Sequence, residues 1–203
     1  MIGKYNPSVI LTYIGVCISI AGMALVFRGN LSAAMICFIF AGICDLFDGV
    51  IARKCKRTEE EKQFGVQIDS MADMISFVAF PVVIGLNSAG EDLWLTVPVM
   101  MLYSLCGIIR LAWFNMTTNS EGNRKYYDGL PVTYSALIFP LLWLLNGYVS
   151  EFLFSILWTA AYIVTAFLFV LNIKIRKPTG VWYVIFGVLA ITVAAVIIVK
   201  EVL

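Results

Sequence analysis

The sequence predicts an all-α protein that crosses a membrane several times. Hydrophobic residues make up 61% of its 203 positions and charged residues only 13%, whereas a soluble domain carries about 25% charged residues. Apolar runs of about 20 residues recur along the chain, which is the length that an α-helix needs to cross a hydrocarbon core. These runs are continuous rather than alternating, which argues against the strands of a membrane barrel.

Seven apolar segments are expected to form helices, at about residues 8–27, 31–53, 64–87, 93–116, 131–147, 151–172 and 180–199. The first run has no obvious small-residue cleavage site, so it is interpreted as a transmembrane helix rather than a signal peptide. The fifth is short, and Pro140 is expected to kink or tilt it. The breaks between segments hold Gly, Pro, Asn and charged residues, as interfacial loops do. We expect one transmembrane domain over residues 1–203.

The basic residues predict the orientation, because cytoplasmic loops carry an excess of Lys and Arg. With the N-terminus inside, only Arg28 and Lys200 fall outside, and Arg110 lies near the inner end of the fourth helix. The chain is therefore expected to be an integral protein of the cell membrane with its N-terminus in the cytoplasm. The remaining basic residues all fall on the inner side: Lys4, Arg53, Lys54, Lys56, Arg57, Lys62, Arg124, Lys125, Lys174, Arg176 and Lys177.

Four aspartates lie within or beside the apolar runs, close to the predicted cytoplasmic face. Asp45 and Asp48 share one face of the second helix, and Asp69 and Asp73 share one face of the third. A short polar turn joins these helices, so they must be antiparallel neighbours whose acidic faces can converge. The same faces carry the small residues Gly49, Ala52, Gly65 and Ser76, which could either make space for a ligand or serve close helix packing.

The chain contains no histidine, so any metal or acid–base chemistry would fall to carboxylates. Carboxylates favour hard cations such as Mg²⁺, Mn²⁺ or Ca²⁺. Four carboxylates in one pocket of low dielectric constant repel one another, and two divalent cations would nearly balance their charge. Such cations keep coordination positions open for phosphate oxygens. The pattern thus predicts a two-cation site that acts on a phosphoryl group.

The run "DLFDGVIAR", followed after a spacer by "G", three residues, "D", three residues and "D", resembles the signature of the CDP-alcohol phosphotransferases. The spacer between Arg53 and Gly65 holds 11 residues and is longer than is usual in that family. All eight fixed positions of the signature are matched, by Asp45, Asp48, Gly49, Ala52, Arg53, Gly65, Asp69 and Asp73.

Further motifs resemble the phosphatidylserine synthase branch of this family. They are "FGVQIDSMADMISFVAFP", "RLAWFN" and "GLPVTYSA", in which Trp113 and Thr133 depart from the branch's pattern. The resemblance covers about residues 8–177. It implies a six-helix catalytic bundle, to which the segment at about 180–199 would be a seventh, C-terminal transmembrane helix.

The resemblance also implies an activity and a set of site residues. The family transfers a phosphatidyl group from CDP-diacylglycerol to an alcohol, here L-serine, and releases CMP. Two divalent cations, Mg²⁺ or Mn²⁺, with Ca²⁺ as an inhibitor or substitute, would be held by the four aspartates, and Asp73 would also be the general base. Family members commonly form homodimers, and no nucleic-acid partner is implied. The expected CDP-lipid contacts are Gly49, Ala52, Arg53, Gly65 and Thr12, and the expected acceptor contacts are Arg110 and Asn115.

Several alternatives stay open from the sequence. The acceptor could be glycerol phosphate or inositol phosphate, and the donor could be an archaeal ether lipid. Arg53 and Arg110 could be arginines that reach toward the membrane surface without binding a ligand, and Arg124 and Lys125 are weaker candidates for ligand contacts. A cation transporter is the alternative from another class of protein, since intramembrane acids also mark ion paths.

Overall fold

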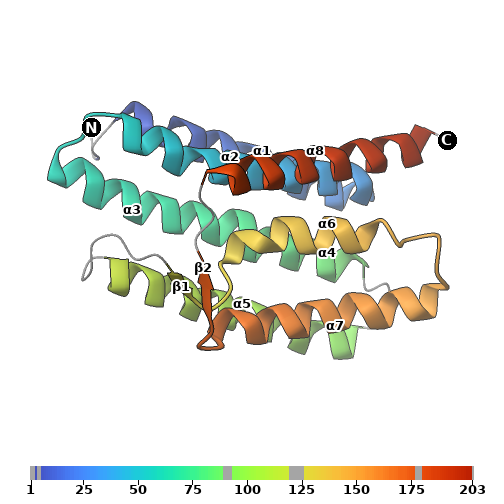
Figure 1. Cartoon of the computed structure of the whole chain (residues 1–203). Helices are drawn as coiled ribbons and strands as arrows, with labels where there is room; N and C mark the ends of the chain where they lie inside the picture. Colours follow the sequence, from blue (N-terminus) through green and yellow to red (C-terminus); the bar gives the residue numbers. More distant parts are fainter. Residues whose placement is uncertain (1–2, 4–5, 89–92, 119–125, 177–179, 203) are drawn as a thin grey trace.

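The computed structural model describes residue 3 and residues 6–88, 93–118, 126–176 and 180–202 as a bundle of long helices (Figure 1). The helices are α1 (Ile10–Phe27), α2 (Leu31–Lys54), α3 (Glu59–Asp73), α4 (Phe80–Ser88), α5 (Leu93–Thr118), α6 (Ser135–Trp143), α7 (Glu151–Val170) and α8 (Val181–Val202). Short helical turns at Pro7–Val9, Met74–Ala79 and Val132–Tyr134 extend α1, join α3 to α4 and precede α6. Two strands, β1 (Tyr126–Asp128) and β2 (Lys174–Arg176), complete the described chain.

Six helical segments of the described chain are long and apolar enough to cross a membrane. A shorter apolar helix at Val132–Trp143 lies between them in sequence and contains Pro140. The predicted all-α membrane bundle with a C-terminal transmembrane helix is therefore confirmed. The six spans are Pro7–Phe27, Leu31–Lys54, Glu59–Ser88, Leu93–Thr117, Glu151–Val170 and Val181–Glu201.

The third span begins earlier than the apolar pattern predicts. Thr58 caps it, because its side chain accepts from the Glu61 backbone N–H at 3.2 Å while Glu61 Oε2 accepts from the Thr58 N–H at 2.7 Å. This reciprocal capping box satisfies N–H groups that the first turn of a helix leaves free. Residues 59–61, which fall in the predicted break between the segments at 31–53 and 64–87, therefore form the first turn of α3.

A π-helical turn, Met74–Ala79, interrupts the third span directly after Asp73. Pro81 follows it and lacks the N–H with which an α-helix would bond the carbonyl of Phe77. Two side chains from other helices take that place: Tyr103 Oη donates to the Phe77 carbonyl at 2.8 Å and Ser135 Oγ at 3.4 Å. Tyr103 of α5 and Ser135 of α6 thus hold the turn that begins at the residue after Asp73.

The helices pack in two groups. α1 lies along α2, and α5 lies along α7, while α2 also contacts α6 and α8 (Figure 1). Between α5, α6 and α7 the core is aromatic, and the rings of Phe139 and Tyr162 stack with centroids 4.2 Å apart. Tyr103 and Tyr162 meet edge to face at 5.3 Å. These rings pack α5, α6 and α7 together, and α6 in turn contacts α2, the helix that carries two of the four aspartates.

The two strands were not predicted from the sequence. β1 pairs with β2 in antiparallel register, with Tyr127 opposite Ile175. Gly129 makes the pairing possible, since its φ of +82° suits glycine and an added Cβ would lie 2.7 Å from the Phe169 carbonyl oxygen. Tyr126–Asp128, which fall in the predicted break between the segments at 93–116 and 131–147, therefore form a strand and not only an interfacial loop.

Candidate active site

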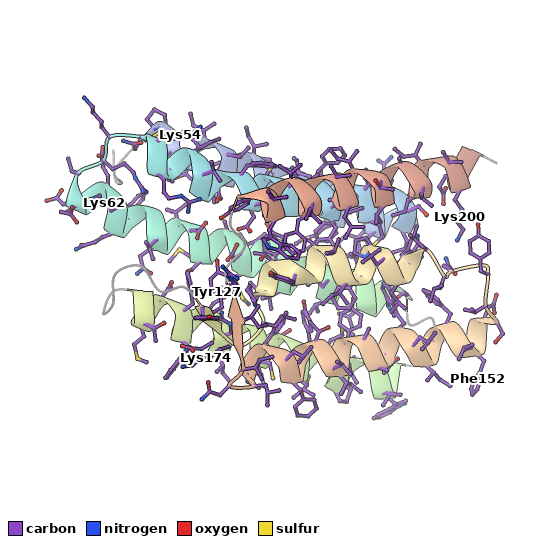
Figure 2. The ribbon with its side chains drawn as sticks, in the orientation of Figure 1. Lys54, Lys62, Tyr127, Phe152, Lys174 and Lys200 are labelled. Carbon is purple, nitrogen blue, oxygen red and sulfur yellow. The ribbon has the colours of Figure 1, made fainter. Side chains whose placement is uncertain are left out.

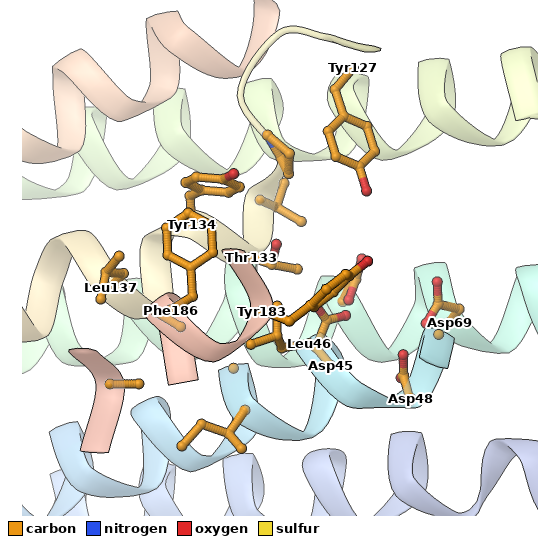
Figure 3. A pocket seen from close by; sticks show the side chains of 18 of the residues that line it. Asp45, Leu46, Asp48, Asp69, Tyr127, Thr133, Tyr134, Leu137, Tyr183 and Phe186 are labelled. Carbon is orange, nitrogen blue, oxygen red and sulfur yellow. The ribbon is translucent and has the colours of Figure 1, made fainter. Parts of the chain in front are cut away.

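The structure brings the four aspartates together at one cavity. Ligand oxygens of Asp45, Asp48 and Asp69 lie within 4.8 Å of one another, and the carboxyl groups of Asp45 and Asp73 are in hydrogen-bond contact. All four line a cavity of about 250 Å³. The acidic faces of α2 and α3 converge as their helical spacing predicts, and Figure 3 shows Asp45, Asp48 and Asp69 around the same space.

The chemistry of this cluster suits hard divalent cations. Asp48 is only 7% exposed, and Thr12 Oγ1 on α1 donates to Asp48 Oδ2 at 2.8 Å. Among the described residues that line the cavity, two cationic side chains, Arg53 and Arg110, face the four carboxylates. Oxygen-donor clusters with excess negative charge are the ligand sets that Mg²⁺ and Mn²⁺ prefer. The residues present therefore fit the predicted metal site.

The small residues of the signature differ in their positions. Gly49 lines the cavity, and an added Cβ there would meet only the Arg53 guanidinium, at 3.8 Å. Gly65 is buried, and its nearest side-chain neighbour is the Arg57 guanidinium, 3.6 Å from the position of a Cβ. Neither Gly65 nor Ala52 is among the lining residues. The contacts predicted between these residues, or Thr12, and a CDP-lipid stay predictions.

Arg110 enters the cavity from α5. Its side chain is 5% exposed, its Nε donates to the Leu130 carbonyl at 3.1 Å, and its guanidinium lies 5.9 Å from the centre of the Phe114 ring. A side chain buried and held in this way does not reach for the membrane surface. Arg110 lines the cavity, where it also interacts electrostatically with Asp73.

Asn115 lies beside the cavity rather than in its lining. Its Oδ1 accepts from Ser70 Oγ at 2.5 Å, which ties α5 to α3 at the residue after Asp69. Thr133, one of the two departures from the synthase pattern, lines the cavity, whereas Trp113 is 48% exposed and does not. Arg124 and Lys125 lie outside the described residues.

Aromatic side chains that the sequence did not single out form the wall opposite the acids. Tyr127 from β1, Tyr134 from the turn before α6, and Tyr183 and Phe186 from α8 line the cavity (Figure 3). Burial raises the pKa of Tyr127 to about 12, and the negative charge of Asp45 acts in the same direction. Tyr127 is therefore a hydrogen-bond donor at neutral pH.

One side of the cavity is apolar. Its lining there consists of Ile39, Ile43 and Leu46 of α2, Ala136 and Leu137 of α6, and Ala190 of α8. The cavity thus combines an acidic floor, a wall with phenol and guanidinium donors, and an apolar flank between helices that cross the membrane. This combination suits a ligand with both an anionic head and hydrocarbon chains.

Comparison with known proteins agrees with the site. The family model for CDP-alcohol phosphatidyltransferases matches residues 5–167, which include all four aspartates. The chain belongs to the CDP-alcohol phosphatidyltransferase family. The matched range ends within α7, so β2 and α8 lie beyond it.

Individual relatives cover different shares of the chain. An archaetidylserine synthase of Methanothermobacter thermautotrophicus is 33% identical over 74% of this chain and 60% of its own length. A CDP-diacylglycerol–serine O-phosphatidyltransferase of Saccharomyces cerevisiae is 36% identical over 47% of this chain and 36% of its own length. One of Bacillus subtilis is 28% identical over 68% of this chain and 75% of its own length. The chain thus spans less than two thirds of the methanogen and yeast proteins.

Proposed function

We propose that this protein transfers a phosphatidyl group from CDP-diacylglycerol to the hydroxyl of L-serine and releases CMP. The observation that carries the proposal is the convergence of Asp45, Asp48, Asp69 and Asp73 on a cavity with an apolar flank. The relatives named as serine O-phosphatidyltransferases support the same reaction. The acyl chains of the donor would lie along the apolar flank, and the diphosphate of the donor would lie at the four aspartates.

The four aspartates would hold two divalent cations. Asp45, Asp48 and Asp69 would bind the first, and Asp45, Asp69 and Asp73 the second. When bound, Mg²⁺ or Mn²⁺ would neutralise charge on the diphosphate and on the departing CMP, and Ca²⁺ would inhibit or substitute. Arg53, which lines the cavity at the end of α2, would bind a phosphate oxygen.

The remaining steps belong to side chains of the chain itself. Asp73 would accept the proton of the serine hydroxyl as the new bond to phosphorus forms. Arg110 would bind the serine carboxylate, since guanidinium pairs well with carboxylates. Because Asp73 and Arg110 both line the cavity, a small acceptor can contact both at once. Its hydroxyl would then face the donor phosphate.

The proposed setting is the cytoplasmic side of the cell membrane. Lys54 and Lys62 lie at one end of the long helices and Lys200 at the other (Figure 2). The acids lie toward the end that carries Lys54, where the positive-inside rule places the cytoplasm. We further propose that the working form is a homodimer, as is common in the family.

An acceptor screen tests the proposal. Purified protein is given CDP-diacylglycerol, Mg²⁺ or Mn²⁺, and either serine, glycerol phosphate or inositol phosphate, and the release of CMP is measured. We expect release that depends on serine. Release with another of these acceptors and none with serine would overturn the choice of acceptor.

A second candidate donor is favoured by one relative. The methanogen protein, 33% identical to this chain, is named an archaetidylserine synthase, so an ether-linked CDP-lipid is the alternative donor. The same assay with diacyl and ether donors side by side distinguishes them. A lower KM for the ether donor would replace CDP-diacylglycerol in the proposed reaction.

A further inference from the structure

α8 lies beyond the residues that match the family, which end at residue 167, yet it forms part of the cavity wall. Tyr183, Phe186 and Ala190 line the cavity and share one helical face. At Gly187 an added Cβ would be in ordinary van der Waals contact with the ring of Phe47 on α2, at 3.9 Å, and α8 packs along α2. The helix is therefore packed on the catalytic bundle, with Tyr183 held at the site.

The strand pair brings a second phenol to the same space. Tyr127 lies opposite Ile175 of β2, and the chain that continues from β2 leads into α8. The Tyr127 ring also packs on Phe114 of α5, with centroids 6.3 Å apart. Figure 3 shows Tyr127 and Tyr183 approaching from different elements, with their phenol oxygens directed into the space that Asp45 borders.

The distribution of charge restricts how an acceptor can lie here. Four carboxylates form one side of the cavity, and the proposed cations and donor diphosphate would occupy that side, so the carboxylate of an acceptor would face the opposite wall. On that wall the Arg110 guanidinium lines the cavity while its Nε donates to the Leu130 carbonyl at 3.1 Å. A guanidinium fork meets a carboxylate through two parallel N–H···O bonds, whereas a carboxylate offers about four lone-pair sites, so neighbouring phenols can donate to the others.

We propose that Tyr127 and Tyr183, together with Arg110, form the subsite that binds the polar head of a small amino-acid acceptor, so that α8 is part of the active site. This inference rests on the proposed function. Tyr183 and Tyr127 lie close enough to interact electrostatically, and Tyr127 also interacts with Arg110. The rings of Tyr134 and Phe186, with centroids 5.8 Å apart, close the subsite behind Tyr183 and favour a compact acceptor.

Removing each phenol oxygen while keeping the ring tests the subsite. The variants Tyr183→Phe and Tyr127→Phe should each raise the KM for serine about tenfold, because hydrogen bonds to charged groups are lost. The KM for CDP-diacylglycerol should stay within about twofold of wild type, since the phenols are assigned to the acceptor and not the donor. Tyr126→Phe is the matched control for β1, because Tyr126 is 50% exposed and does not line the cavity. Tyr148→Phe is the second control, at a tyrosine that is 77% exposed.

Two results overturn the subsite: an unchanged KM for serine in both site variants, or a KM for the donor that rises as much as that for serine. Wild-type turnover decides the proposed function separately. If wild type uses another acceptor, the same comparison of KM values is made with that acceptor. Calorimetric binding of serine to the CMP-loaded protein is a readout that needs no turnover, and equal affinity in wild type and both variants also overturns the inference.

Discussion

At the scale of single residues, Asp73 differs from the other three aspartates in its surroundings. Asp45, Asp48 and Asp69 form the cluster whose oxygens lie within 4.8 Å of one another. Asp73 contacts Asp45, directly precedes the π-helical turn, and interacts electrostatically with Arg110. It therefore lies between the metal cluster and the wall proposed to bind the acceptor, which is where a base for the acceptor hydroxyl is needed.

The Asp73→Asn variant should lose turnover by at least about a hundredfold, because a neutral amide cannot accept the proton in the transfer step. CMP release with serine measures the effect. Glu151→Gln is the control, since Glu151 is an exposed acid at the start of α7 and its loss of charge should leave turnover unchanged. Wild-type turnover in Asp73→Asn would remove this residue from the mechanism.

Thr12 supports the metal cluster from outside it. Its hydroxyl donates to Asp48 at 2.8 Å, and partners of this kind typically change metal affinity about 10–100-fold when removed. The Thr12→Val variant should therefore bind Mn²⁺ about tenfold more weakly, as measured by the free Mn²⁺ signal in electron paramagnetic resonance. Thr192→Val is the control, because the Thr192 hydroxyl donates to the Val188 carbonyl of its own helix and Thr192 does not line the cavity. Equal affinity in Thr12→Val and wild type would contradict this role.

The aspartates could be predicted from the sequence, but the aromatic wall could not. Asp45 and Asp48 share a face by helical spacing alone, and a short loop forces their neighbours on α3 to meet them. Tyr127 and Tyr183 reach the cavity only through the β1–β2 pairing and the packing of α8. No local pattern encodes those contacts, because they depend on where α5 and α7 end in space.

At the scale of elements, close helix packing is what brings α1 against the catalytic helices. Gly22 of α1 is buried, and an added Cβ would lie 2.8 Å from Cys37 Cβ of α2 and still closer to the ring of Phe80 on α4. Small residues at such positions allow helices in membranes to approach closely. Close packing therefore explains Gly22, a residue that was not singled out from the sequence, while Gly49 opens onto the cavity.

The two glycines should consequently respond differently to the same substitution. Gly22→Ala should destabilise the protein by about 1–3 kcal/mol, the usual cost of overpacking, and lower its melting temperature in detergent. Gly49→Ala is the matched variant and should leave the melting temperature unchanged, because its new methyl group meets only the Arg53 side chain at 3.8 Å. Equal melting temperatures for wild type and Gly22→Ala would show that α1 can move away without cost.

Element boundaries show where sequence interpretation was incomplete. The apolar pattern placed the start of the third helix near residue 64, but the helix begins at Glu59. The Thr58–Glu61 capping box was legible as a T-x-x-E signal. The π-helical turn was not legible, since it depends on Tyr103 and Ser135 donating to the Phe77 carbonyl from other helices.

At the scale of the whole molecule, the acids of α2 and α3 meet at the cavity, while α2 packs on α1, α6 and α8 and α3 contacts α1 and α5. The helices were predictable from the apolar segments because the backbone of a long hydrophobic run in a membrane must form its hydrogen bonds within the run, and an α-helix does so. α6 and α8, which pack on α2, supply part of the apolar flank of the cavity, and α8 also supplies the phenol of Tyr183. The catalytic proposal therefore requires that acids from two different helices act as one cation site.

Binding of Mn²⁺ to purified wild type, Asp45→Asn and Asp69→Asn, followed by electron paramagnetic resonance, tests this requirement most directly. The first variant changes α2 and the second changes α3. Wild type should bind Mn²⁺, and each variant alone should lose most of that binding, because both helices contribute ligands to the same ions. Mn²⁺ affinity equal to wild type in both variants would contradict the account.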